Sequence, residues 1–189
     1  MIGLIHVLLF DLLHELGGDA VVKEVRARAK IPEERTFRIN QVYEDAEWRR
    51  IFEASLATLD MEEAPLNEVF ANAFVNDAMR RWPTWFARSP TARSLIELQP
   101  IIHNSFATGL RDSRERQAID DKFLLERQPQ RVVVHYRSPN RHCGLYIALA
   151  RRVLAQYGEQ AHIQEPYCTR RGDTECQIEI DWDPAAVAS

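Results

Sequence analysis

The stretch ELQPIIHNSF, residues 97–106, places one imidazole, that of His103, in an apolar segment. A helix turns by about 100° per residue, so the face that carries His103 also carries a set of apolar residues: Ile96, Pro100, Phe106, Ala107 and Leu110. An imidazole in such a wall can ligate a metal or a haem iron; the alternative is a core histidine bonded to a neighbour. Pro100 removes a helical hydrogen bond, so we expect a bend there.

A second set of polar residues lies in YRSPNR, residues 136–141, and consists of Tyr136, Ser138 and Arg141. Two hydroxyls and a guanidinium near the start of a helix suit a carboxylate or a phosphate. The alternative is structural, with Ser138 as the N-cap and Pro139 at the first helical position. The residues alone leave both interpretations open.

The third set is the three cysteines, Cys143, Cys168 and Cys176. Cys168 and Cys176 flank a predicted turn, and Cys143 follows His142 at the start of a predicted helix. Thiolates with a histidine or carboxylate as fourth ligand can hold zinc tetrahedrally. An oxidisable pair, or three semi-buried thiols without chemistry, would fit the same residues.

Composition excludes several classes of function. The chain has 189 residues, is 46% hydrophobic and carries a net charge of −4, which is typical of a globular protein and gives no basis for nucleic-acid binding. No apolar run reaches the roughly 20 residues that span a bilayer, so we expect no membrane segment. The odd number of cysteines argues against a disulfide scaffold, and the apolar start lacks the basic n-region of a signal peptide. We therefore expect a cytoplasmic protein. With seven glycines, no phosphate loop and no hydrolase motif, the sequence does not indicate an enzyme.

The pattern of apolar residues predicts an α+β protein. Helical spacing extends over residues 2–29, with a break at Gly17 and Gly18, and then over about 43–60, 65–82 and 91–110. A hairpin is expected over 122–138, an amphipathic helix over 143–157 ended by Gly158, and a second hairpin over 161–182 that turns at 171–173. We therefore expect a helical N-terminal part followed by an antiparallel sheet in strand–strand–helix–strand–strand order.

The order of these features resembles that of H-NOX domains, the haem–nitric oxide/oxygen sensors related to the haem domain of soluble guanylate cyclase. The likeness includes an MxGxI start, DAEWRRIF at 45–52, WPTWF at 82–86, IIH at 101–103, the Tyr-x-Ser strand end and a terminal helix with a hairpin. It implies one sensor domain over 1–182, with a helical part over about 1–60, a haem-cradling part over about 61–182, and a tail over 183–189.

The resemblance also implies a cofactor, haem b, with His103 as the proximal ligand of the iron. Tyr136 and Ser138 match two members of the family's Tyr-x-Ser-x-Arg signature, which binds the haem propionates. Asn140 stands where that signature has arginine, and Arg141 follows one residue later. Arg141 is therefore the predicted third contact to a propionate.

The resemblance further implies the identity of the gas. Members that hold O₂ usually carry a tyrosine where alignment from Tyr136 places Leu145. The expected distal wall is apolar and consists of Ile5, Leu9, Phe74, Leu145 and Leu149. We therefore expect a nitric oxide sensor in which NO weakens the bond between iron and His103. Its signalling partner would be a separate histidine kinase or cyclic-di-GMP enzyme in a bacterium.

Some bacterial members of the family carry zinc near the C-terminal hairpin on three cysteines and a histidine. Cys143, Cys168 and Cys176 match the cysteine positions, and Glu165 stands in the histidine position, with His142 and His162 as substitutes. Two alternatives stay open. One is a haem-free redox or zinc sensor that uses these cysteines. The other is a small-molecule-binding module like the distantly related 4-vinyl reductase domain, because the segment CTRRGDTEC resembles the end of that domain.

Overall fold

The structure, a computed structural model, describes residues 1–106, 113, 116 and 122–182. It contains two compact units, Met1–Phe74 and Val75–Ser189. The predicted end of the His103 helix, including Ala107 and Leu110, lies outside the described residues, and so does the predicted tail at 183–189.

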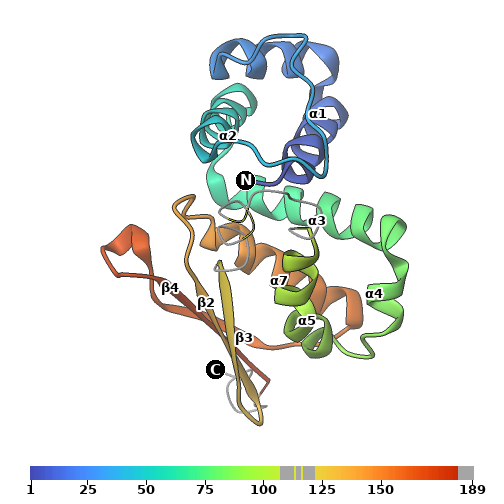
Figure 1. Ribbon diagram of the computed structural model, residues 1–189, viewed down its shortest axis with the longest axis vertical. Helices are drawn as coiled ribbons and strands as arrows, with labels where there is room; N and C mark the ends of the chain where they lie inside the picture. The colour runs from blue at the N-terminus through green and yellow to red at the C-terminus, as the bar shows by residue number, and fades with distance from the viewer. Residues whose placement is uncertain (107–112, 114–115, 117–121, 183–189) are drawn as a thin grey trace. The chain divides into compact units, whose positions relative to one another are not determined.

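The N-terminal unit is built on two helices, α1 (Gly3–Ala29) and α2 (Asp45–Leu59), which pack against each other (Figure 1). Within α1, Gly18 has a φ of 67°, a left-handed conformation that glycine adopts without steric cost. The predicted interruption at Gly17–Gly18 is therefore present as a kink rather than a gap. The core of the unit surrounds Trp48, which is fully buried.

The helices that follow are α3 (Glu63–Arg81), α4 (Pro83–Ala87), α5 (Ala92–Ser105) and α7 (Cys143–Tyr157). The short α4 was not predicted; it begins at Pro83, a residue suited to the first helical position because its N–H is not needed there. Thr91 caps α5 in a capping box with Ser94. As predicted, α7 ends at Gly158, which has a φ of 66°.

Four strands form one antiparallel sheet in the order β1-β2-β4-β3. They are β1 (Phe123–Arg127), β2 (Arg131–Tyr136), β3 (His162–Tyr167) and β4 (Cys176–Asp181). A 3₁₀ helix, Thr169–Arg171, lies between β3 and β4, where the sequence predicted only a turn. The α+β class and the strand–strand–helix–strand–strand order are confirmed.

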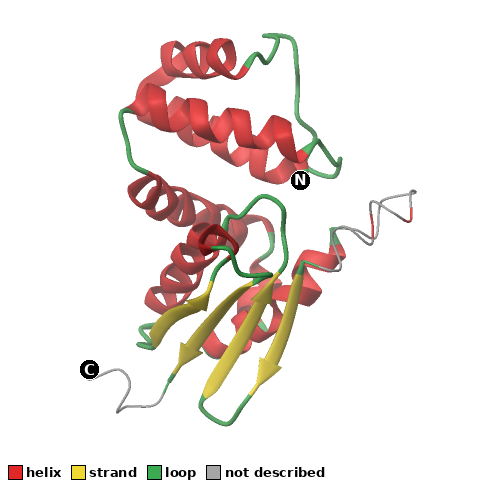
Figure 2. Ribbon diagram, turned by 90° about the vertical axis from the view of Figure 1, so that its left-hand side faces the viewer, coloured by secondary structure: helices red, strands yellow, loops and turns green. Residues whose placement is uncertain are grey.

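The core of the C-terminal unit lies between this sheet and the helices α5 and α7, which cover one face of it (Figure 2). Val132, Val134 and Tyr136 alternate along β2 and point to that side, as period-2 burial requires. Fully burying one such valine is worth about 1.5–3 kcal/mol. The end of β2 is therefore fixed in position by the core.

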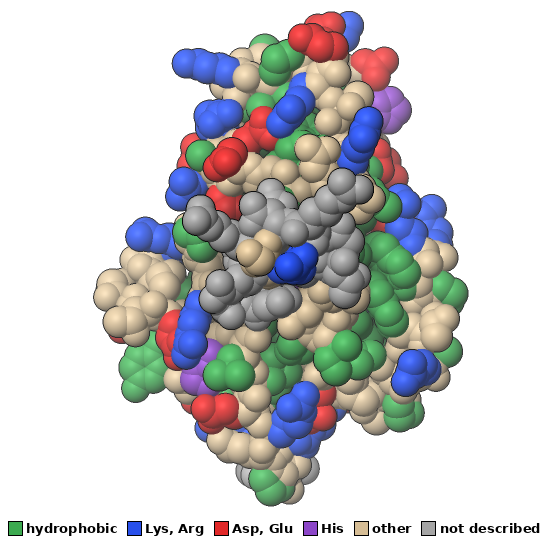
Figure 3. All heavy atoms as spheres, viewed as in Figure 1, with side chains coloured by type: hydrophobic (Ala, Val, Ile, Leu, Met, Phe, Trp, Pro, Cys, Tyr) green, Lys and Arg blue, Asp and Glu red, His purple; other side chains and the backbone are tan. Residues whose placement is uncertain are grey.

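On the face shown in Figure 3, charges of both signs are mixed among the described residues and no basic block is visible. Among the described helices, none is long and apolar enough to cross a membrane.

Candidate functional site

His103 lies on the last turn of α5 and is half-buried. Its ring meets the ring of Phe123, the first residue of β1, edge-on, with 4.9 Å between centroids and 76° between planes. The Phe123 ring in turn lies 5.1 Å from that of Tyr136 and 5.5 Å from that of Tyr146. One phenylalanine thus separates the candidate iron ligand from the end of β2, in surroundings made of aromatic rings.

Tyr136 is the last residue of β2 and is buried. Burial raises the pKa of its hydroxyl to about 12, although hydrogen bonds from the Ser138 side chain and the His142 backbone oppose the rise. Ser138 is also buried, and its Oγ accepts a hydrogen bond from the backbone N–H of Asn140 at 3.3 Å. Two of the three predicted carboxylate contacts therefore stand together.

The alternative interpretation of Ser138 as a helix cap is wrong. The helix α7 begins at Cys143 with His142 at its N-cap, so Pro139 is not in its first turn. The reason is the turn before it, where Arg141 has a φ of 55°. A non-glycine residue with a positive φ is strained in a right-handed helix, so the regular turns of α7 start only after it.

The two residues at the departure from the family signature differ in burial. Asn140 is only 4% exposed, and neither Nδ2 nor Oδ1 of its side chain has a hydrogen-bond partner within the described part of the chain. Arg141 is exposed, and its carbonyl oxygen accepts hydrogen bonds from Nε and Nη2 of Arg170 at 2.9 and 2.6 Å. The sequence prediction singled out Arg141 and gave Asn140 no role. The sequence did contain one signal for Asn140, because a polar residue stands at the last position of the signature.

The predicted distal residues of α7 lie on a different face from the sheet-side core. Leu145 is buried and Leu149 half-buried, and neither belongs to the core cluster between sheet and helix. Tyr146 does belong to that cluster, and burial raises the pKa of its hydroxyl. The tyrosine next to Leu145 is therefore part of the protein core.

The remaining predicted wall residues belong to the N-terminal unit. Leu9 is fully buried in it, whereas Ile5 and Phe74 are half-buried. The Phe74 ring lies 6.4 Å from that of Phe70. That these three residues contact a cofactor stays a prediction.

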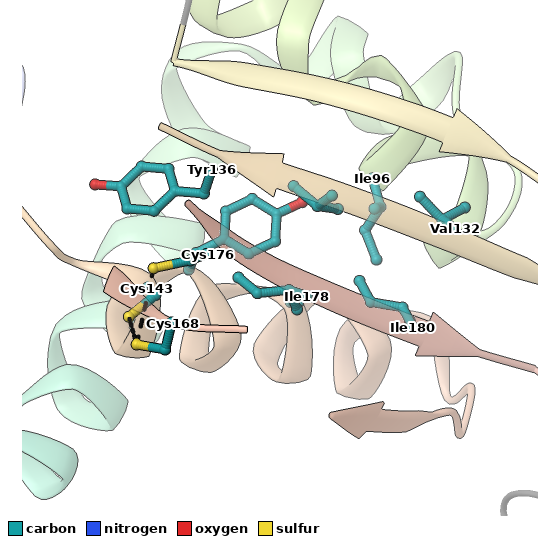
Figure 4. Packing of buried hydrophobic residues seen from close by; sticks show 11 residues of the cluster. Ile96, Val132, Tyr136, Cys143, Cys168, Cys176, Ile178 and Ile180 are labelled. Atoms are coloured by element: carbon teal, nitrogen blue, oxygen red, sulfur yellow. Dashed lines mark hydrogen bonds between the residues drawn. The ribbon is translucent and has the colours of Figure 1, made fainter. Parts of the chain in front are cut away.

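The three cysteines come together below Tyr136, with their sulfurs pointing toward one another (Figure 4). Sγ of Cys168 lies 3.6 Å from Sγ of Cys143 and 3.8 Å from Sγ of Cys176. A disulfide requires about 2.05 Å, so all three are free thiols, and all are buried. One ligand atom from each thiol and from Glu165 lie within 4.8 Å of one another.

Glu165 reaches the thiols through an irregularity in the sheet. The pairing of β3 with β4 shifts between Gln164 and Tyr167, and a bulge of this kind redirects a side chain. Oε1 of Glu165 is buried and has no partner among the described residues, while Oε2 lies 3.4 Å from Nη1 of Arg171. Of the substitutes predicted for this position, neither His142 nor His162 is in the group.

Two of the thiols, those of Cys143 and Cys168, are held in their protonated form. Burial, and secondarily the adjacent Glu165 side chain, raises the pKa of Cys143, and burial also raises the pKa of Cys168. A divalent cation at this point would reverse both effects, because it stabilises thiolates and satisfies the carboxylate oxygen. Three sulfurs and one oxygen match the number and type of ligands in a closed zinc site.

The C-terminal unit therefore combines a half-buried imidazole, a buried polar strand end and a thiol cluster around one antiparallel sheet. The sequence profile of the haem-NO-binding family (HNOB) matches residues 2–165, most of the chain. The chain therefore belongs to this family, whose H-NOX members are haem-based gas sensors.

Solved structures with the same fold include H-NOX proteins. One, from S. oneidensis in the Fe(II)NO ligation state, has a TM-score of 0.78 and 18% identity over 96% of this chain and 98% of that one. Another, an Fe(II) unliganded mutant from K. algicida, has a TM-score of 0.75 and 17% identity over the whole of both chains. No curated protein matches the sequence.

Proposed function

We propose that this chain is a nitric oxide sensor that carries haem b, with His103 as the protein ligand of the iron. The observation that carries the proposal is that the rings of His103 and Tyr136 both lie against the ring of Phe123. Aromatic surroundings, one imidazole and buried hydroxyls fit a flat apolar cofactor with carboxylates at one end. When bound, ferrous haem supplies the iron atom to which nitric oxide binds.

Tyr136 and Ser138 are the donors we assign to the carboxylates. A pKa of about 12 keeps the Tyr136 hydroxyl protonated at any physiological pH, so it remains a hydrogen-bond donor. Hydroxyls inside a protein make short bonds to carboxylates and lose little conformational freedom in doing so. The two residues are therefore suited to orient the carboxylate end of the cofactor.

Nitric oxide, rather than O₂, is the ligand we assign. Bound O₂ needs a hydrogen-bond donor beside it, whereas NO binds ferrous iron without one. Leu145 is a buried apolar residue, and the adjacent Tyr146 is packed in the sheet-side core. The α7 residues predicted for the distal side, Leu145 and Leu149, thus provide no donor.

Anchoring of α5 at one end supports a route for the signal. The backbone N–H of Ala92, the first residue of α5, donates to Glu159 Oε1 at 2.9 Å, and Arg93 donates to the carbonyls of Gln128 and Pro129. His103 lies at the other end, beyond Pro100, which cannot donate a helical hydrogen bond. Release of His103 would therefore move the last turn of α5 while its first turn stays fixed. We assign the output to a separate histidine kinase or cyclic-di-GMP enzyme that distinguishes the two states.

The test is an absorption spectrum of the reduced, anaerobic protein before and after addition of NO. We expect a ferrous haem band that shifts to a five-coordinate nitrosyl form. The His103→Gly variant should lose the protein ligand and regain a comparable band only with added imidazole. The matched control is His162→Gly, since His162 is exposed at the start of β3. If wild-type protein takes up no haem during expression, or if His162→Gly behaves like His103→Gly, the proposal is wrong.

A second candidate function is zinc-dependent thiol sensing at the cysteine cluster. The buried Glu165 Oε1, which has no hydrogen-bond partner among the described residues, lies within 4.8 Å of three thiols and supports it. The residues Cys143, Glu165, Cys168 and Cys176 would hold the ion. Peroxide would then oxidise two thiolates to a disulfide, take up their two electrons together with two protons from solvent to form two water molecules, and release the metal.

Zinc content and thiol counts before and after peroxide test this function. We expect one zinc per chain, lost after oxidation together with two titratable thiols. Glu165→Ala should lower zinc affinity and Glu165→His should raise it, because imidazole is a better zinc ligand than a carboxylate. Glu53→Ala, at an exposed position of α2, is the control. Equal zinc content in all variants would refute the site.

A further inference from the structure

The loop between β2 and α7 contains a buried amide that the fold itself does not use. Nδ2 and Oδ1 of Asn140 lack hydrogen-bond partners among the described residues, although the side chain is almost fully buried. A buried amide without a partner is destabilising, and such groups are rare in folded proteins. The cost indicates that a ligand supplies the missing bonds.

We propose that Asn140 binds a carboxylate of the cofactor through its side-chain amide, in place of the arginine of the family signature. This inference rests on the proposed haem-binding function and adds to it a residue specific to this chain. Nδ2 donates to the carboxylate, as a neutral counterpart of a guanidinium.

The loop brings Asn140 next to one of the other two donors, Ser138. Ser138 Oγ accepts a hydrogen bond from the backbone N–H of Asn140 at 3.3 Å. Tyr136, Ser138 and Asn140 are all less than one-tenth exposed. Three polar side chains are thus buried within five residues of one another in the chain.

Arg141 is held away from this position. Its φ of 55° turns the chain, and its carbonyl is fixed by two hydrogen bonds from the Arg170 guanidinium. Its backbone N–H donates to the Ser138 carbonyl at 3.2 Å. With the backbone fixed on both sides, the Arg141 side chain remains exposed while that of Asn140 is buried. The neutral side chain of Asn140 therefore takes the place of the charged arginine of the family signature.

The rate at which haem leaves the protein, measured by transfer to an excess of apomyoglobin, tests the inference. Asn140→Leu should release haem about tenfold faster, the equivalent of one hydrogen bond of about 1.4 kcal/mol. Asn140→Arg should release it more slowly, because a charge-assisted bond is about twice as strong. Arg141→Ala is the matched control and should stay within about twofold of wild type.

A second measurement separates ligand binding from a structural role. Removing an unpartnered buried amide does not weaken the apo-protein, so apo Asn140→Leu should melt at or above the wild-type temperature. In the holo-protein, the resonance Raman bending band of the haem propionates should shift in Asn140→Leu and not in Arg141→Ala. With haem dimethyl ester, whose carboxylates are blocked, wild type and Asn140→Leu should release the cofactor at rates within about twofold of each other.

The outcomes distinguish this inference from the proposed function. If wild type takes up no haem, the proposed function fails. If wild type binds haem through His103 but Asn140→Leu releases it at the wild-type rate, or if Arg141→Ala is the variant that releases it faster, Asn140 is not the anchor. A lower melting temperature of apo Asn140→Leu would also overturn the inference, because the amide would then have a structural role.

Discussion

His6 and His103 each lie on an apolar helix face, yet the two units surround them differently. His6 is fully buried in the N-terminal unit, stacked on Phe37 at 4.6 Å between ring centroids and edge-on to Trp48 at 5.1 Å. His103 is half-buried on the last turn of α5 with the Phe123 ring beside it. A core histidine is enclosed on all sides, whereas a ligand must keep one nitrogen accessible to a metal. The enclosure of the ring, and not the helix pattern, distinguishes a core histidine from a candidate ligand.

Replacing each histidine by leucine should give the largest difference between them. His103→Leu removes the proposed iron ligand, so the ferrous haem band should be lost or strongly altered. His6→Leu exchanges a neutral, enclosed ring for an apolar side chain and should leave haem content and spectrum unchanged. The measurement is the haem-to-protein ratio and the absorption spectrum of the reduced variants. If His6→Leu lost the ferrous haem band while His103→Leu kept it, His6 and not His103 would be the candidate iron ligand.

Acid should destabilise the N-terminal unit through His6. Burial, with the nearby N-terminal ammonium and Arg35, lowers the pKa of His6 from 6.5 to about 4, although a backbone hydrogen bond at Ile2 opposes the shift. Between these values the unfolded chain binds the proton and the folded chain does not, so stability falls as pH falls from about 6.5 to 4. The loss over that window is about 3 kcal/mol.

Urea unfolding of the full chain at pH 7, 5.5 and 4.5 measures this loss. Wild type and His6→Leu should differ in the pH dependence of their unfolding free energy by an amount that grows toward pH 4. The variant lacks the titrating group and should lose less stability. If the unfolding free energies of the two proteins changed equally with pH, folding would not lower the pKa of His6 and the prediction would be wrong.

Much of the architecture follows from local patterns in the sequence. The kink at Gly18, the end of α7 at Gly158 and both hairpins depend on turn residues and on periodicity within short segments. The geometry of the candidate site does not follow from local patterns. Whether Asn140 or Arg141 faces inward depends on a guanidinium 29 positions away, that of Arg170, which fixes the turn. No local pattern encodes that contact.

The same limit applies to the cysteine cluster. Resemblance to the family predicted its cysteines and placed Glu165 beside them, and the structure brings the four residues together. The bulge that turns Glu165 toward the thiols comes from the pairing of β3 with β4, where Pro166 cannot donate a ladder hydrogen bond. Such pairing is a property of two strands and is not visible in either one alone.

The anchored end of α5 should contribute to stability and not to iron ligation. Glu159 accepts from the N–H of Ala92 and from Trp182 Nε1 at 3.1 Å. Ala92 is fully buried, so Glu159→Ala leaves its N–H without a partner, at a cost of about 1–3 kcal/mol. Chemical denaturation should show this loss, while the position of the ferrous haem band stays as in wild type. Thr91→Ala, which removes the cap, should cost about 1 kcal/mol.

The smallest expected effect links the thiol cluster to residues 136–140, which are proposed to hold the haem carboxylates. Tyr136 and Cys176 are directly opposite in the pairing of β2 with β4, and Cys143 follows that loop at the start of α7. A metal on the thiols would fix both ends of the segment that carries Tyr136, Ser138 and Asn140. Chelation of zinc should therefore increase the haem release rate by about two- to fivefold, which is under about 1 kcal/mol.

The variants define where that effect originates. In Glu165→Ala, which should bind zinc poorly, chelator should change the release rate little, whereas in His6→Leu the full effect should persist because His6 belongs to the other unit. Haem transfer measured with and without chelator in the three proteins gives the comparison. A chelator effect of the same size in Glu165→Ala would mean that the thiols and the loop act independently. Its disappearance in His6→Leu would mean that the N-terminal unit transmits it.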